Sequence, residues 1–171
     1  LKHILKTFIF IDKGFFMEKI ALYKYGKFYL NNKFLFETNV VRKWFVREKY
    51  QIIDAFGKVQ LFFYLKHGFR FSKIVFKENN LSSSYEFVQN KNSFYWIYNG
   101  HKYYIKQPFS FSYKIEFYRD NELIGSSLKN SFWKSYFDQI TFSFLNFITD
   151  EEIELYLILY AIHYVYFGIG D

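Results

Sequence analysis

The chain has 171 residues, a formal net charge of +7 and no cysteine. This length favours one domain with a sizeable core, and the lack of cysteine excludes disulfide bonds and cysteine-ligated metal sites. Aromatic residues make up 26% of the chain and proline occurs once. An AT-rich genome could produce much of this excess, but the composition favours strands over helices whatever its origin.

The start of the chain is unusual, because residue 1 is Leu and the single methionine is Met17. We expect residues 1–17 to be an N-terminal extension that precedes the native start, and residues 18–171 to form the domain. The alternative is that Leu1 is a non-standard start or the beginning of a fragment. The apolar run "FIFI" is short, lies between two lysines and has no cleavage site after it, so a signal peptide is not indicated.

From Lys19 onward, runs rich in aromatic and β-branched residues alternate with turn signals. Residues 19–26 and 27–37 come first, and the second run turns at Asn31-Asn32, because asparagine tolerates positive φ. Residues 47–65 predict a hairpin that turns between Asp54 and Gly57. The strongest hairpin signal is Asn99-Gly100 between two strand-like runs in residues 93–106.

Further strand-like runs cover residues 70–80, 83–92, 113–127 and 131–147. Alternation is clear in the last of them, where Ile140, Phe142 and Phe144 are separated by Thr141 and Ser143. About ten to twelve short strands at roughly even spacing predict a sandwich or a barrel.

Residues 150–168 predict a helix. Thr149 or Asp150 is a suitable N-cap, the acidic run "DEEIE" suits the positive end of the helix dipole, and Gly168 can end the helix. From Leu155 to Gly170 the segment has no charge and is apolar or aromatic on every side. Such a helix either spans a membrane or lies inside the protein.

The environment of this helix decides the fold. A membrane span needs about 20 apolar residues, whereas this segment is shorter and holds His163 and several tyrosines. Burial in protein stabilises each large apolar side chain by roughly 1.5–3 kcal/mol, several times the gain from insertion in lipid. We therefore expect an antiparallel closed barrel of about twelve strands that encloses the helix, with a membrane-anchored tail as the alternative.

Many short strands followed by a hydrophobic C-terminal helix resemble the tubby C-terminal-like superfamily, which includes tubby proteins, phospholipid scramblases and LURP-one-related proteins. The segments that carry the likeness are "YQIIDAFGKVQLFFY" and "FDQITFSFLNFITDEEIELYLILYAIHYV". The resemblance implies a twelve-stranded barrel around a central helix, and it covers roughly residues 20–170. In that superfamily, tubby proteins bind phosphoinositides through a basic patch and scramblases are attached to membranes.

Basic residues gather in the first half of the chain, where residues 1–50 hold 11 Lys or Arg against 4 Asp or Glu. Cations beside aromatic residues such as Trp44 suit an anionic lipid surface or single-stranded nucleic acid, of which we favour the lipid. The alternative is a solvated strand edge with Trp44 in the core. The candidate lipid- or anion-binding residues are Arg42, Lys43, Arg47, Lys49, Lys66, Arg70 and Lys73.

No motif in the sequence names a reaction. The four histidines lack the spacing of a metal site, and there is no phosphate-binding glycine loop or nucleophile elbow. We interpret His163 as a buried histidine or one near a barrel mouth, and His101 as exposed. We expect a non-enzymatic interaction module without metal or cofactor, located in the cytoplasm and peripherally at the membrane. The alternative is a small-molecule-binding barrel or an enzyme with its site at the barrel mouth.

Overall fold

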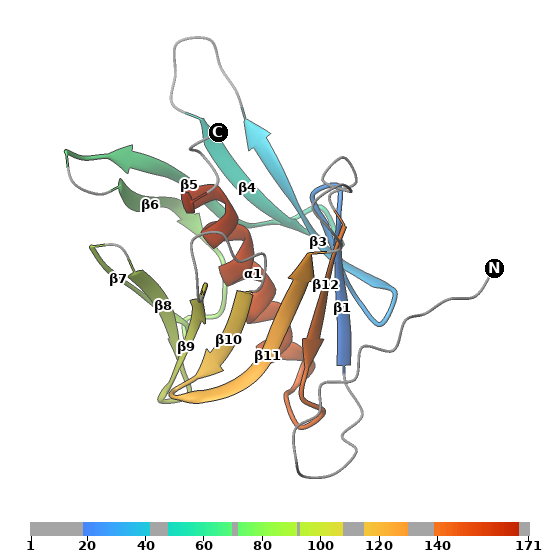
Figure 1. The fold of residues 1–171 in the computed structure, drawn as a ribbon. Coiled ribbons are helices and arrows are strands. Elements are labelled where there is room, and N and C mark those ends of the chain that lie inside the picture. Colours follow the sequence, from blue (N-terminus) through green and yellow to red (C-terminus); the bar gives the residue numbers. More distant parts are fainter. Residues whose placement is uncertain are drawn as a thin grey trace.

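The computed structural model describes residues 19–41, 48–69, 72–91, 93–107, 115–129 and 139–167. Within these residues, twelve strands precede one α-helix (Figure 1), as the sequence predicts. The predicted N-terminal extension, residues 1–17, lies outside the described residues. The elements are β1 (Lys19–Lys24), β2 (Lys27–Leu30), β3 (Lys33–Val41), β4 (Lys49–Asp54), β5 (Val59–His67), β6 (Ser72–Asn79), β7 (Glu86–Asn90), β8 (Ser93–Tyr98), β9 (His101–Lys106), β10 (Ile115–Arg119), β11 (Glu122–Lys129), β12 (Gln139–Phe144) and α1 (Asp150–Phe167).

The strands form one antiparallel sheet in the order β6-β5-β4-β3-β2-β1-β12-β11-β10-β9-β8-β7. The first strand pairs with the last, from Lys19 opposite Phe144 to Lys24 opposite Gln139. The sheet curls until its two edge strands meet, and the rings of Phe76 on β6 and Phe87 on β7 lie 4.9 Å apart. The result is a nearly closed barrel whose seam lies between β6 and β7.

Tight turns occur where the sequence predicts them. Asn31, Asn32, Asn99 and Gly100 all have positive φ, which two-residue hairpin turns require. In the turn after β4, the Oδ1 atom of Asp54 accepts hydrogen bonds from the amides of Phe56 and Lys58, each 2.9 Å long. These local interactions fix the register of the hairpins.

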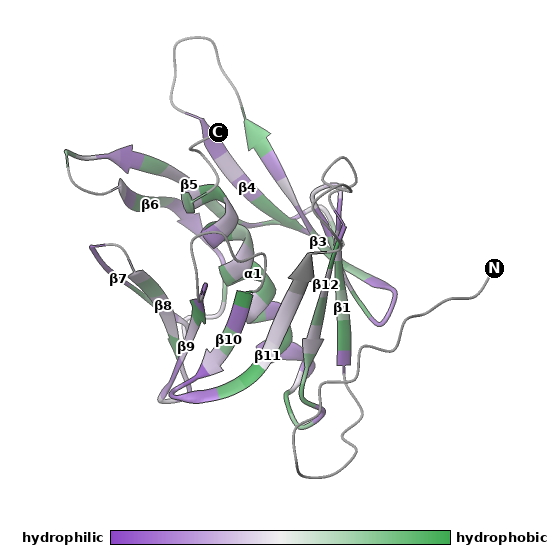
Figure 2. Ribbon diagram, viewed as in Figure 1, coloured by the Kyte–Doolittle hydropathy of each residue, from purple (hydrophilic) through white to green (hydrophobic). Residues whose placement is uncertain are grey.

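Side chains alternate between the interior and the outer surface of the barrel. Ile140, Phe142 and Phe144 are buried, whereas Thr141 and Ser143 between them are partly exposed, which confirms the predicted alternation in β12. Figure 2 shows hydrophilic and hydrophobic residues alternating along the strands. Because strand side chains repeat every two residues, each strand places one aromatic-rich row inside.

Helix α1 runs through the barrel (Figure 1). All residues from Glu152 to Ile162 are buried except Glu154, which is partly exposed. The Tyr160 ring contacts Phe28 and Phe142, on β2 and β12, and the Tyr156 ring contacts Tyr103 on β9. The helix is thus surrounded by the sheet, which confirms the prediction that the barrel encloses it.

The barrel has two unlike ends, because the antiparallel strands alternate in direction. The turn end holds the start of α1, where Asp150 lies beside Lys19, and the hairpin turns at Asn31, Asp54, Asn99 and Asp120. The loop end holds the end of α1 at Phe167, together with the last residues of β1, β3, β5, β7, β9 and β11 and the first residues of the strands that follow them. We use these two names below.

Candidate functional site

The predicted basic residues divide into two groups. Arg42, Lys43, Arg47 and Arg70 lie outside the described residues, although the strands that flank them, β3–β4 and β5–β6, meet at the loop end. Lys49, Lys66 and Lys73 lie on three neighbouring strands, β4, β5 and β6. The structure therefore tests the convergence of these three lysines.

The strand register places the three lysines on one surface. Lys49 lies opposite Tyr64, and Lys66 lies directly opposite Lys73. Tyr64 and Lys66 have the same parity on β5, so both point away from the buried row that includes Leu65. Lys49, Lys66 and Lys73 therefore share the outer face of β4–β6, near the loop end, and we call these three residues the lysine face.

Two members of the lysine face carry uncompensated charge. Like charges directly opposite each other on adjacent strands repel, and Lys66 and Lys73 make no ion pair within the described part of the chain. Lys49 instead lies over the Phe62 ring at 5.7 Å. An anion placed between Lys66 and Lys73 would remove their repulsion.

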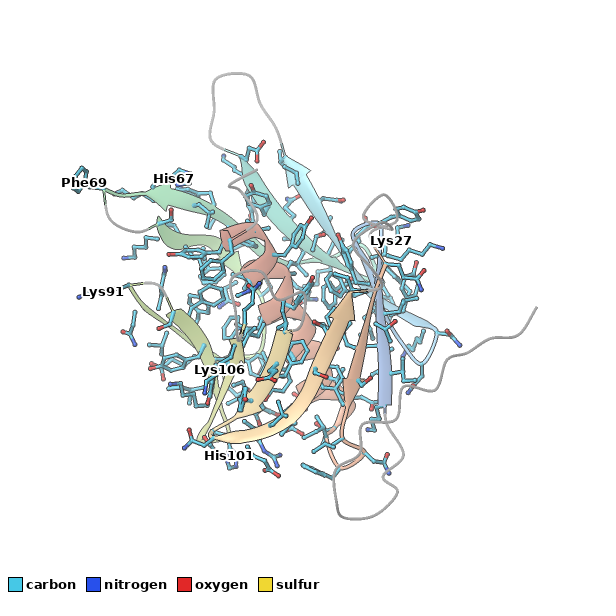
Figure 3. All side chains as sticks on the ribbon, in the orientation of Figure 1. Lys27, His67, Phe69, Lys91, His101 and Lys106 are labelled. Atoms are coloured by element: carbon cyan, nitrogen blue, oxygen red, sulfur yellow. The ribbon has the colours of Figure 1, made fainter. Side chains whose placement is uncertain are left out.

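A fully exposed aromatic residue adjoins this pair. Phe69 follows β5 at the tip of the β5–β6 hairpin and is 102% exposed. At the base of this tip, Nδ1 of His67, the last residue of β5, lies 2.9 Å from Oγ of Ser72, the first residue of β6. Figure 3 shows Phe69 and His67 together, and Lys91 at the tip of the β7–β8 hairpin, far from His101 at the turn end. The loop end thus presents an apolar ring beside cations.

Charge is distributed unequally between the two ends. The described cations at the loop end are Lys24, Lys27, Lys49, Lys66, Lys73, Lys91 and Lys106, accompanied by Glu37, Glu48 and Glu116. At the turn end, Lys19, Lys33, Lys58, Lys77, Lys102 and Arg119 are outnumbered by Asp54, Glu78, Glu86, Asp120, Glu122, Asp150, Glu151, Glu152 and Glu154. The field of these residues therefore orients the loop end toward anions.

A second group of cations and aromatic residues, which sequence reasoning missed, lies on the outer face of β8–β10. Tyr95, Tyr104 and Tyr118 are cross-strand neighbours, and Tyr104 stacks on Tyr118 at 5.3 Å. Lys102 lies 4.3 Å from the Tyr95 ring and Lys106 lies 4.6 Å from the Tyr118 ring. Because the lysines already cover the ring faces, we interpret this row as stabilising the sheet rather than as a binding platform.

The acidic start of α1 belongs to a buried network that the sequence did not reveal. Glu152 and Thr149 form a capping box, since the Thr149 amide donates to Oε2 of Glu152 at 2.9 Å and the Glu152 amide donates to Oγ1 of Thr149 at 3.2 Å. Glu152 also accepts hydrogen bonds from the Tyr103 hydroxyl at 2.8 Å and from Arg119 at 3.2 Å. Burial alone would raise the pKa of Glu152, but these hydrogen bonds together lower it.

The network also changes the pKa of Tyr103. Burial and the bond to Glu152 raise the pKa of Tyr103, so the tyrosine stays a hydrogen-bond donor. Because Glu152, Arg119 and Tyr103 satisfy one another, the arrangement ties the helix to β9 and β10. We assign it a structural role.

His163 and His101 occupy the places that the sequence indicated. His163 lies near the loop end, packed against Phe94 and Phe167 at 6.2 and 4.5 Å, and burial lowers its pKa to about 4. His101 is exposed and lies 2.8 Å from Asp120. Among the described residues, no group of His, Asp and Glu has the arrangement of a metal site.

Comparison with known proteins finds no matching family model, curated protein or solved structure. A search of the described helices for one with the length and hydropathy of a membrane span also finds none.

Proposed function

We propose that this protein is a non-enzymatic binding module that docks on anionic phospholipid surfaces through the loop end of its barrel. The observation that carries the proposal is the Lys66–Lys73 pair, which lies beside the fully exposed Phe69 without an acidic partner among the described residues. An anionic lipid surface offers phosphate groups that can bind the lysines and an apolar acyl-chain region in which the Phe69 ring can be buried.

The expected binding is weak and reversible. Each lysine near an anionic membrane contributes about 1 kcal/mol, and burial of the Phe69 ring contributes roughly 2 kcal/mol. The lysine face and Phe69 together thus provide about 5 kcal/mol, which corresponds to a dissociation constant somewhat below 1 mM. Arg42, Lys43, Arg47 and Arg70 retain their predicted role and would each strengthen binding by a similar amount.

Two further considerations support a membrane partner. The charge asymmetry between the ends would orient the barrel with its loop end toward the bilayer before contact. The strand and helix order resembles the tubby C-terminal-like superfamily, in which binding to phosphoinositides and attachment to membranes occur. We therefore place the protein in the cytoplasm, peripherally at the membrane.

Vesicle sedimentation tests this function. At low salt, we expect the full chain to sediment with phosphatidylcholine vesicles that contain phosphatidylserine and to stay in the supernatant with phosphatidylcholine alone. The K66Q/K73Q variant should lose most of the bound fraction, and F69S should reduce it about tenfold or more, since removal of the ring removes roughly 2 kcal/mol. Added salt should release the wild-type protein because it screens the lysines.

The turn end offers matched controls. Phe56 is 95% exposed in the β4–β5 turn, and Lys33 and Lys58 are exposed at the same end. We expect F56S and K33Q/K58Q to sediment like the wild-type protein. Equal recovery with neutral and anionic vesicles, or equal loss from the two double-lysine variants, would refute docking through the loop end.

A further inference from the structure

The barrel closes at its seam by a side chain rather than by a strand ladder. Strands β6 and β7 are the two ends of the sheet order. Across the seam, the Nε2 atom of Gln89 on β7 donates to the carbonyl oxygen of Ser72 at 2.8 Å. The Oε1 atom of the same residue accepts from the amide of Ile74 at 2.9 Å. Both bonds are made by one flexible side chain.

The two bonds have the pattern of a β-bridge. In a parallel ladder, one residue bonds to the carbonyl of one neighbour and to the amide two residues further along, and Ser72 and Ile74 are two residues apart. The carboxamide of Gln89 therefore occupies the place of a peptide group beside Lys73. It satisfies an edge that would otherwise offer unpaired groups to another strand.

A residue of α1 also joins β6 to the β7–β8 turn at the loop end. The Tyr166 hydroxyl lies 2.9 Å from the Ser72 carbonyl oxygen and 3.3 Å from that of Lys91. Tyr166 thus reaches both sides of the seam from the last turn of α1. Its ring packs on Phe94 of β8 at 5.4 Å.

The remainder of the seam is held differently. Towards its middle, Phe76 meets Phe87 and Trp96 at 4.9 and 6.3 Å, and these contacts are aromatic. At the turn end, the Tyr85 hydroxyl donates to Glu151 at 2.6 Å. The loop-end half of the seam therefore depends on side-chain hydrogen bonds for which water competes, whereas its middle depends on ring packing.

We propose that the loop-end half of the β6–β7 seam is a latch, closed by Gln89 and Tyr166, through which the barrel opens locally. Opening exposes Phe94 and the last two turns of α1, which include His163 and Phe167, while the backbone-paired strands stay closed. Regions held by few hydrogen bonds are those in which local opening costs least. This inference is independent of any lipid ligand.

Amide hydrogen exchange on the full chain tests the latch. In the wild-type protein, the Ile74 amide should be protected although β6 is an edge strand, because Gln89 accepts its hydrogen. In Q89L, which keeps the approximate volume of the side chain, we expect the Ile74 amide to exchange roughly tenfold faster or more. Peptides from β6, β7 and residues 160–167 should also exchange faster, whereas the exchange of peptides from β2 and β12 should not change.

Two further variants make the result decisive. Y166F retains the ring and removes only the hydroxyl, so it should accelerate exchange in the same segments by a smaller factor. Q60L removes a side-chain hydrogen bond within the β4–β5 hairpin, where Gln60 donates to Asp54 at 2.6 Å, and should leave the seam unchanged. Unchanged exchange in both Q89L and Y166F would overturn the latch. So would faster exchange that is uniform over the described strands, because it would indicate loss of global stability.

Discussion

At the scale of single residues, we expect His163 to make the stability of the fold depend on pH. Burial lowers its pKa to about 4 from an ordinary value of 6.5, so folding favours the neutral imidazole. The unfolded chain therefore binds a proton first as the pH falls, and stability decreases from about pH 6.5 down to about pH 4. A shift of this size corresponds to a loss of up to about 3 kcal/mol.

We expect the H163F variant to lose much less stability across this range, because phenylalanine has no proton to bind and suits the contact with Phe94 and Phe167. Urea denaturation at several pH values from 7 to 5 measures the difference. The carboxyl pKa values of Glu152, Asp54 and Asp120 are lowered, so their stabilisation is present above their unfolded pKa values and is lost only at lower pH. Parallel pH profiles for wild type and H163F would contradict this account.

Single residues also explain why the lysine face was only partly predictable. Clustering in the sequence selected Lys49, Lys66 and Lys73 without regard to direction, and alternation sends adjacent residues to opposite faces. These three share a face because the β4–β5 and β5–β6 registers place Lys49 opposite Tyr64 and Lys66 opposite Lys73. Register depends on bulges and turn lengths, which composition does not encode.

At the scale of elements, Gly125 allows β11 and β12 to pair closely, because it has no Cβ atom. A Cβ atom on this residue would lie 2.7 Å from the Ser143 carbonyl oxygen and 2.6 Å from Cδ1 of Phe144. The backbone oxygen cannot move without breaking the β11–β12 ladder, and Phe144 is buried against Phe117 at 5.1 Å. A side chain here would therefore disturb both the ladder and the core.

We expect Gly125→Ala to lower the free energy of unfolding by about 3 kcal/mol, as overpacking of a buried site does. Gly100→Ala is the matched comparison. A Cβ atom at Gly100 meets nothing within 4 Å, but φ is +77° there, so backbone strain alone costs about 1 kcal/mol. Thermal or urea unfolding of both variants measures the difference, and a smaller loss for G125A than for G100A would show that the β11–β12 pair yields easily.

Elements were the level at which the sequence was most informative. Asn99-Gly100 and Asn31-Asn32 marked their turns because a two-residue hairpin requires positive φ and few residues accept it. The acidic run before Ile153 correctly indicated a helix start. It did not reveal that Glu152 bonds to Arg119, because that contact joins residues 33 positions apart and leaves no local pattern.

At the scale of the whole molecule, one segment determined the architecture. A helical segment without charge on any side, as from Leu155 to Phe167, has to be surrounded by apolar material, and a sheet of twelve strands is long enough to enclose it. The sequence did not indicate where the sheet would fail to close. Gln89 occurs in an ordinary strand-like run, and its role at the seam exists only because β6 and β7 are brought together from opposite ends of the sheet order.

Since the helix fills the barrel, the sheet should not fold without it. Tyr156, Leu157, Leu159 and Tyr160 are buried against strands on several sides, and loss of eight or more such side chains removes roughly 15 kcal/mol at 1.5–3 kcal/mol each. That equals or exceeds the whole stability of an ordinary domain, about 5–15 kcal/mol. A chain without residues 150–171 should therefore lose its cooperative thermal transition and its near-ultraviolet circular dichroism, and should aggregate.

A single substitution separates the loss of packing from the loss of chain length. Leu157→Asp places a carboxylate at a fully buried position. Residues 150–171 contain no Lys or Arg that could pair with it, so the substitution should abolish the same transition. Glu151→Gln alters an exposed position in the first turn of the same helix and should unfold cooperatively, with a small loss of stability from the weakened Tyr85 hydrogen bond. A truncated chain that kept a cooperative transition and native near-ultraviolet signal would mean that the sheet is stable around an empty interior, which contradicts the dependence of the barrel on its helix.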